Sequence, residues 1–476
     1  MGIRASMPAR VRALIAALIV AVVAFGAALF IGYRSGLVAA ENRFQMGGGT
    51  LASLDLHFLG SQVVDQHLID LAFQQVERHY YKPVESQLLI NGERSGLLGY
   101  LRSRHIAARL PAATAAGDPL EISRTLDQQL SYAQAQYGTR LGKAAGPDLA
   151  EAAVDGMLRS LGDPYTVYLS PLQIQALNEA LSGGNFGGIG VFIYQLRTHE
   201  IVLEPIEDLP AARAGMHGNE VVETIDGAPI RGLTLDRVER LIRGPEGTSV
   251  RIATHLYGGK ARRHYIITRE IIHVPTVHAK MENGYDYLRL TDFGESSAQE
   301  VHKALLAGKA QGAKGYIIDL RDNGGGLLDA AVAISSFFIP NGPIVTEIDR
   351  AGDKQTASAN GAVVQGIAPL VVLVNGYTAS ASEITAGALQ DYKAATLIGT
   401  KTFGKGVVQG IFTMPNGGAL KITTQRYLTP AGRDIQHKGI QPDIVVTQSP
   451  DMVIMDTPRD KQLKAAKAYL AHSARY

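Results

Sequence analysis

The longest apolar run in the chain lies close to its N-terminus. Between Ala13 and Tyr33 the sequence ALIAALIVAVVAFGAALFIGY carries no charge. As a helix this run rises about 31 Å, enough to cross the hydrocarbon core of a bilayer. The residues before it include arginines but no acid, which favours a cytoplasmic N-terminus. The pattern predicts a cytoplasmic tail over 1–12, a transmembrane signal-anchor over 13–33, a linker over 34–67 and an extracytoplasmic body.

A cleaved signal peptide is the alternative reading of this run. The apolar region of a signal peptide usually covers about 7–15 residues, and this run is longer. Small residues at Val38-Ala39-Ala40 nevertheless offer a cleavage site. The first reading holds the body in the periplasm or at the outer face of the cytoplasmic membrane, and the second secretes it. Both readings place the body outside the cytoplasm.

Helical periodicity follows the linker and predicts a helical N-terminal region over 68–180. Apolar residues from Leu68 to Tyr80 are spaced for one helical face. A weak echo offset by 60 positions relates Gly96 to Gly156 and their leucine-rich surroundings. The stretch near 92–148 between these copies is interpreted as an insertion, and a dimerisation element and a lid are both compatible with it. A turn signal at Gly162-Asp163-Pro164-Tyr165 closes the region.

From Phe186 the pattern changes to short strands separated by glycine-rich turns. It predicts a compact domain over 181–272 with several strands, a short helix near 211–214 and a longer helix over Leu235–Ile242. Strand and helix patterns then alternate over 273–450, with apolar strands at 315–320, 369–374 and 395–399. Such alternation predicts parallel pairing with right-handed crossovers. The fold class is therefore α/β and α+β multidomain, ending in a helical tail over 451–476.

Composition narrows the chemistry that this body can perform. The chain has 476 residues, a formal net charge of +2, and neither cysteine nor tryptophan. A cysteine nucleophile, a disulfide and a thiolate metal site are therefore excluded. The near-neutral balance shows no basic footprint for nucleic acid. We expect no metal and no cofactor, so that any reaction depends on Ser, Thr, Lys, His, Asp or Glu.

Ser380 lies where an apolar strand turns into a helix, in the sequence YTASASEIT. Serine at such a position is ordinarily a helix N-cap, but Ser382 offers a second cap and leaves Ser380 open to another role. Amides at a helix start can also bind an oxyanion. An isolated serine hydroxyl is a poor nucleophile and needs a base.

Lys405 is the candidate base, although a loop lysine is ordinarily a solvated charge. It lies between two glycines in TFGKG, after an aromatic residue and between two predicted strands. Burial there favours the neutral amine that could take the serine proton. The run from Gly399 to Lys405 also matches the start of a phosphate-binding loop. However, Gly406 stands where that motif needs Ser or Thr, and a strand pattern follows instead of a helix.

Two resemblances emerge from these motifs. The segment carrying FGGIGV, DLPAARAGMHGNEVVETIDG and IRGPEGTSVRI resembles a PDZ domain of the permuted bacterial kind, although a plain small β-rich domain would share part of its pattern. The run VNGYTASASEITAGALQDYKAATLIGTKTFGKGVVQ, with LRDNGGGLL, GDPYTVYL and TTQRYLTPAGRDIQHKGIQPDIVV, resembles the carboxy-terminal processing peptidases, which are tail-specific serine proteases of the S41 type.

The second resemblance implies a ClpP/crotonase-like α/β catalytic core and a serine endopeptidase. It implies Ser380 as nucleophile, Lys405 as general base and Gln409 as the residue that orients the lysine, although Gln409 could also be a strand residue facing solvent. Backbone amides of Ala381 and Gly325 would form the oxyanion hole, with Gly324 replacing the family's proline.

The PDZ resemblance implies that C-terminal tails of protein or peptide substrates bind at a glycine loop, and that a nearby arginine could gate access. The residues concerned are Gly187, Gly188, Ile189, Gly190 and Arg243. The chain could also form a homo-oligomer or need an activating partner. Two alternatives stay open, which are an inactive membrane-tethered PDZ adaptor and a serine protease with a His–Asp pair.

Overall fold

The computed structural model describes residues 61–473, apart from positions 115–116, 143–144, 182–185, 197, 199, 219, 258, 260, 368, 449–456 and 458. Two compact units result. One joins Met1–Leu181 to Thr276–Tyr476, and the other is Ser182–Pro275. The apolar run over 13–33 lies outside the described residues. Within the described part of the chain, no helix combines the length and apolarity that a membrane span needs.

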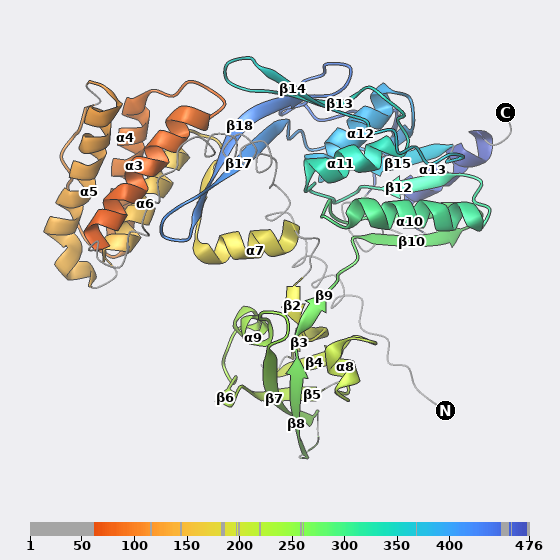
Figure 1. Ribbon diagram of the computed structural model, residues 1–476, viewed down its shortest axis with the longest axis horizontal. Coiled ribbons are helices and arrows are strands. Elements are labelled where there is room, and N and C mark those ends of the chain that lie inside the picture. The colour runs from red at the N-terminus through yellow and green to blue at the C-terminus, as the bar shows by residue number, and fades with distance from the viewer. Residues whose placement is uncertain are drawn as a thin grey trace, which may run out of the picture. The chain divides into compact units, whose positions relative to one another are not determined.

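Four helices open the first unit and form a bundle (Figure 1). They are α3 (Ser61–His79), α4 (Ser86–Ser103), α5 (Pro119–Leu141) and α6 (Ala145–Ser160). The echo positions Gly96 and Gly156 face each other, because a Cβ added to either would collide with the opposite backbone at less than 3.0 Å. Positions 92 and 148 lie within α4 and α6, so the stretch interpreted as an insertion begins and ends inside helices of the bundle.

A six-stranded sheet forms the centre of this unit, in the order β10-β11-β12-β15-β16-β19. Pairing is parallel from β11 to β19, as the alternation of patterns predicts, and only β10 is antiparallel. The strands are β10 (Val277–Glu282), β11 (Tyr285–Leu290), β12 (Tyr316–Asp319), β15 (Leu370–Val374), β16 (Thr396–Gly399) and β19 (Ile444–Val445).

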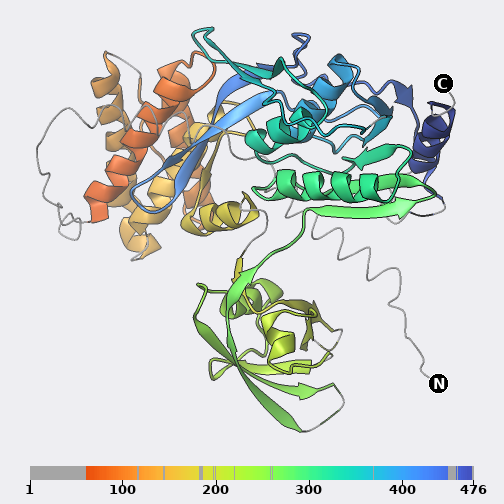
Figure 2. The ribbon, with the colours of Figure 1, turned by 45° about the vertical axis from the view of Figure 1, so that its right-hand side comes forward.

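Helices cover both faces of the central sheet (Figure 2). Val372 and Val374 pack toward α10 (Ser297–Ala310), α11 (Leu328–Ser336) and α12 (Ala381–Asp391). Val371 and Leu373 pack toward α13 (Lys461–Ser473), which is the helix expected in the C-terminal tail. Alternate residues of a strand point to opposite faces. Burial on both sides explains why β15 reads as one continuous apolar run.

A second, antiparallel sheet joins the bundle to the central sheet. Its order is β1-β18-β13-β14, with β17 also paired to β18. The apolar residues Met414, Leu420 and Ile422 of the β17–β18 hairpin pack into the helical bundle. The strands are β1 (Val167–Leu169), β13 (Pro343–Ile348), β14 (Lys354–Ser358), β17 (Val407–Thr413) and β18 (Ala419–Leu428), and α7 (Pro171–Leu181) follows β1.

The second unit is β-rich with two helices, as the change of pattern at Phe186 predicts. Its main sheet has the order β3-β4-β5-β7-β8 with β6 on β5, and β2 pairs with β9. The elements are β2 (Phe186–Gly188), β3 (Val191–Gln195), β4 (Ile201–Pro205), α8 (Pro210–Arg213), β5 (Glu220–Ile225), β6 (Ala228–Pro229), α9 (Leu235–Ile242), β7 (Ser249–Leu256), β8 (Arg262–Thr268) and β9 (Glu270–Ile272).

Candidate active site

Three neighbouring parallel strands bring the candidate residues together. Strands β12, β15 and β16 end at one edge of the sheet. The segments that follow them carry Gly325, Ser380 and Lys405 respectively. Since the carboxyl ends of parallel strands meet at the same edge, residues far apart in sequence become neighbours there.

Ser380 occupies a sharp turn between β15 and α12. Its φ of 56° and ψ of −119° are unusual for a residue with a side chain. It is also the N-cap position of α12, which begins at Ala381. The prediction that Ser382 caps this helix is therefore wrong. The Ser382 hydroxyl instead donates to the carbonyl of Asn323 at 3.0 Å, because the turn after β12 packs against this helix start.

The glycine turn after β12 packs directly against Ser380. A Cβ added to Gly325 would lie 2.7 Å from the Ser380 Cβ and 2.9 Å from the Ala381 nitrogen. Gly325 also has a φ of 109°, which favours glycine. Its N–H, however, donates to the Asn323 side-chain oxygen at 2.9 Å. The prediction of Gly325 as an open oxyanion donor needs correction, because this amide is already paired.

Lys405 is buried, with 3% of its surface exposed. Its Nζ lies 5.0 Å from the centroid of the Tyr165 ring. Burial lowers the pKa of Lys405 to about 7, and the nearby positive charge of Lys421 acts in the same direction. Glu383 and Asp163 oppose this change. The expectation of a buried lysine with a depressed pKa is thus met by the geometry.

Glu383 connects the backbones of the two candidate residues. One of its carboxylate oxygens accepts the N–H of Ser380 at 3.0 Å and that of Lys405 at 2.8 Å. The other accepts the Thr402 hydroxyl at 2.5 Å and the Gly404 N–H at 2.8 Å. Sequence reasoning gave Glu383 no site role, although Ser380-x-x-Glu383 has the spacing of a capping box. That signal could have identified it.

Tyr427 makes the matching connection on the carbonyl side. Tyr427 is buried, with 1% of its surface exposed. Its hydroxyl donates to the carbonyl of Lys405 at 2.6 Å and lies 3.3 Å from the carbonyl oxygen of Ser380. The Ser380 turn and the Lys405 loop are therefore held together through both their N–H and their C=O groups. No local sequence pattern marked Tyr427, because its role depends on the register of β18.

Gln409 is buried in β17 with 3% of its surface exposed, so the alternative that it faces solvent is wrong. It pairs across the sheet with Thr423. Among the described residues, neither Gln409 Nε2 nor Thr423 Oγ1 has a hydrogen-bond partner. The orienting role of Gln409 toward Lys405 stays a prediction.

The glycine turn predicted to bind peptides lies in the second unit. Gly190 has a φ of 71°, and Ile189 is buried at 1% exposure. A Cβ at Gly187 would lie 2.0 Å from the Gly244 carbonyl oxygen, and Gly188 is similarly confined. Arg243 packs over the Phe186 ring, 3.8 Å from its centroid, and forms an ion pair with Glu239.

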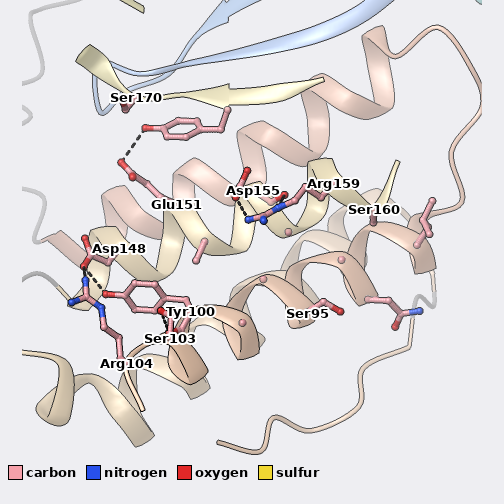
Figure 3. A pocket seen from close by; sticks show the side chains of 18 of the residues that line it. Ser95, Tyr100, Ser103, Arg104, Asp148, Glu151, Asp155, Arg159, Ser160 and Ser170 are labelled. Atoms are coloured by element: carbon pink, nitrogen blue, oxygen red, sulfur yellow. Dashed lines mark hydrogen bonds and ion pairs between the residues drawn. The ribbon is translucent and has the colours of Figure 1, made fainter. Parts of the chain in front are cut away.

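A groove of about 1110 Å³ lies on the helical bundle between α4 and α6, away from Ser380 (Figure 3). Polar contacts line it, such as Tyr100 to Asp148 at 2.5 Å and Tyr168 to Glu151 at 3.1 Å. None of the candidate catalytic residues contributes to this lining. Among the described residues, no group of three or more potential metal ligands is placed to hold an ion.

Comparison with known proteins gives a consistent result. Residues 284–446 match the family model for peptidase family S41. The carboxy-terminal-processing protease of Bartonella bacilliformis is 39% identical over 305 residues, which cover 63% of this chain and 70% of that protein. The carboxyl-terminal-processing protease of Synechocystis is 37% identical over 322 residues, covering 66% and 75%. The solved photosystem II D1 C-terminal processing protease is 27% identical with a TM-score of 0.45, covering 80% of this chain and 93% of its own.

Proposed function

Because the chain belongs to the carboxy-terminal processing proteases of peptidase family S41, and is therefore a hydrolase, we propose that it cleaves peptide bonds with a Ser380–Lys405 dyad. One observation carries the assignment most directly. A single buried carboxylate, that of Glu383, accepts the N–H groups of both residues. This arrangement fixes a strained serine turn beside a buried lysine whose pKa is about 7.

The reaction follows from these positions. Ser380 Oγ attacks the scissile carbonyl carbon while Lys405 Nζ takes the hydroxyl proton. The C–N bond then breaks, and the Lys405 ammonium gives its proton to the leaving amine. Water attacks the carbonyl carbon of the resulting ester while Lys405 takes a proton from it. The C–O bond to Ser380 then breaks, the Lys405 ammonium gives its proton to Ser380 Oγ, and the carboxyl product leaves. Each step uses the neutral amine and its ammonium in turn.

We assign the backbone N–H of Ala381, at the start of α12, as the donor that binds the oxyanion of both tetrahedral intermediates. In the described part of the chain this N–H has no acceptor of its own, and its position at a helix N-terminus favours negative charge. For Gly325 to act as a second donor, its N–H must break its hydrogen bond to the Asn323 side-chain oxygen and donate to the oxyanion instead. Gly325 packs against Ala381 closely enough for both amides to serve one oxygen.

The second unit is assigned as a PDZ domain that binds substrate C-terminal tails. Its strand β3 lies at the edge of the main sheet, where an extended peptide can add as a further strand. The confined turn of Gly187, Gly188 and Gly190 leads directly into this strand. Backbone amides of a glycine-rich segment suit a terminal carboxylate.

A peptide with a free carboxyl terminus and the same peptide with a terminal amide test this binding. Affinity is measured by fluorescence anisotropy on the full chain carrying Ser380→Ala. We expect the carboxylate form to bind at least about tenfold more tightly, in line with loss of a buried charge-assisted contact. Equal affinities would refute carboxylate recognition.

The apolar run over 13–33 is proposed to anchor the body outside the cytoplasm. Protease added to intact spheroplasts should then degrade the body. Protection of the body until the spheroplasts are lysed would refute this orientation.

The dyad itself is tested in the full chain by Ser380→Ala and Lys405→Ala. Each variant should lose cleavage of an unstructured protein while keeping the wild-type circular dichroism spectrum. Ser103→Ala and Lys354→Ala are matched controls on exposed positions and should keep full activity. Proteolysis by the Ser380 variant would exclude this nucleophile, whereas a wild-type chain that binds tails without cleaving them would support the inactive adaptor.

A further inference from the structure

A second buried lysine lies in the sheet that the loop of Lys405 leads into, but it takes no part in the proposed reaction. Lys421 is 6% exposed and lies near the start of β18. Lysine is rarely buried to this extent without a functional or structural reason. It pairs with Ile411 of β17 on one side and with Val167 of β1 on the other.

The strand β1 and the turn before it connect the two lysines. Tyr165, whose ring lies 5.0 Å from Lys405 Nζ, is two residues before Val167, the cross-strand partner of Lys421. The residue between them, Thr166, accepts the N–H of Thr423 at 3.0 Å through its hydroxyl. The turn that contacts Lys405 Nζ is thus hydrogen-bonded to the strand that carries Lys421.

Two carboxylates, those of Asp163 and Glu383, face this pair of lysines. Asp163 acts on both, but its carboxylate already accepts the Tyr165 N–H at 3.0 Å and the Thr166 hydroxyl at 2.7 Å. Glu383 faces Lys405 from α12 and accepts four hydrogen bonds.

The phenols around the pair remain neutral. Burial raises the pKa of Tyr165, which lies against Lys405, and that of Tyr427, which contacts the Lys405 loop from β18. Neither phenol can therefore supply a compensating negative charge near neutral pH.

We propose that Lys421 is a positioning residue that keeps the Lys405 amine unprotonated by holding a second positive charge inside the same buried site. The inference rests on the proposed role of Lys405 as base. Two like charges that share a poorly solvated site are not both stable. Lys405, which gives up its proton, becomes the base. Lys421, which keeps its proton, disfavours protonation of Lys405.

Burial supports this division of roles. It lowers the pKa of Lys421 to about 8 and that of Lys405 to about 7, so that both amines titrate close to neutral pH. The backbone N–H of Lys405 shares the Glu383 carboxylate with that of Ser380, whereas Lys421 lies in the sheet. A positive charge on Lys421 therefore favours the neutral amine at the lysine whose loop is joined to the serine turn.

The test compares kcat/KM against pH from 5 to 9 for the full-length chain and its Lys421→Met variant, with one peptide substrate. Methionine keeps the apolar stem but removes the charge. The acid limb of the variant should move to higher pH by about one unit, with activity below pH 6.5 falling about tenfold and activity at pH 9 preserved. Lys421→Arg keeps a charge and should retain the wild-type limb, and Lys354→Met is the exposed control.

Asp163→Asn provides a change of opposite sign, which remains informative if Lys421→Met folds poorly. Removing this negative charge should move the acid limb to lower pH. An unshifted limb in folded Lys421→Met, while Lys405→Ala is inactive, would overturn the role of Lys421 and leave the dyad standing, whatever the limb of Asp163→Asn does. Full activity of Lys405→Ala would instead refute the dyad. Loss of activity of Lys421→Met at every pH, with the wild-type fold retained, would also overturn the inference.

Discussion

Replacing Tyr427 with phenylalanine tests whether the two candidate residues depend on a shared clamp. The change removes one hydroxyl and keeps the ring in its core position. The Ser380 carbonyl still accepts the Ile384 N–H at 2.9 Å in the variant. The main hydrogen bond that is lost is therefore the 2.6 Å bond from the Tyr427 hydroxyl to the Lys405 carbonyl. Losing a buried hydrogen bond of this kind costs about 1–3 kcal/mol.

The expected result has two parts. The free energy of unfolding in urea should fall by about 1–3 kcal/mol. In addition, kcat should fall about tenfold, because a small displacement of a catalytic group is costly, while KM stays within about twofold. The control is Tyr377→Phe, at a phenol that is 60% exposed. A Tyr427→Phe enzyme with wild-type kcat would refute the view that this hydroxyl holds the Lys405 loop in place.

Three further predictions follow from the same geometry. First, because the active form of Lys405 is neutral and its pKa is about 7, kcat/KM should rise with pH. About one-tenth of the base is available at pH 6 and half at pH 7, and a rate that is flat from pH 5 to 8 would contradict this. Second, the Glu383 carboxylate accepts four hydrogen bonds, and Glu383→Gln replaces one of its oxygens with an NH2 group that cannot accept. The kcat measured by steady-state kinetics should therefore fall at least about tenfold. Third, Arg321 is fully buried between Asp319 and Asp460, so Arg321→Met should lower the free energy of unfolding by about 3–5 kcal/mol. Arg104→Met, at an exposed ion pair, should cost less than about 1 kcal/mol.

The sequence predicts the framework of the site well. Continuous apolar runs at β12, β15 and β16 mark strands buried on both faces, and parallel pairing then requires the segments after them to meet at one edge. The pairing of Ser380 with Lys405 itself came from the resemblance to the carboxy-terminal processing peptidases, with which the positions after these strands agree. The helix Leu235–Ile242 also has the predicted bounds, because Thr234 caps its first turn and Gly244 follows its end.

Features set by tertiary contacts could not be read from sequence. The positions of Tyr427 and Lys421 depend on the register of β18, which local sequence patterns do not fix. The pairing of the Gly325 amide depends on how Asn323 folds back within its turn. The cap of α12 was misassigned because Ser380 and Ser382 are equally good caps by residue type, and only packing against Asn323 distinguishes them.

Covalent trapping of the nucleophile tests the central claim most directly. The full-length chain is incubated at pH 8 with a fluorophosphonate that acylates activated serines, and the labelled peptide is identified by mass spectrometry. The account predicts a single adduct on Ser380, with labelling slowed at least about a hundredfold in Lys405→Ala because general-base assistance is lost. An adduct on another residue, or equally fast labelling of Ser380 without Lys405, would contradict the Ser–Lys assignment.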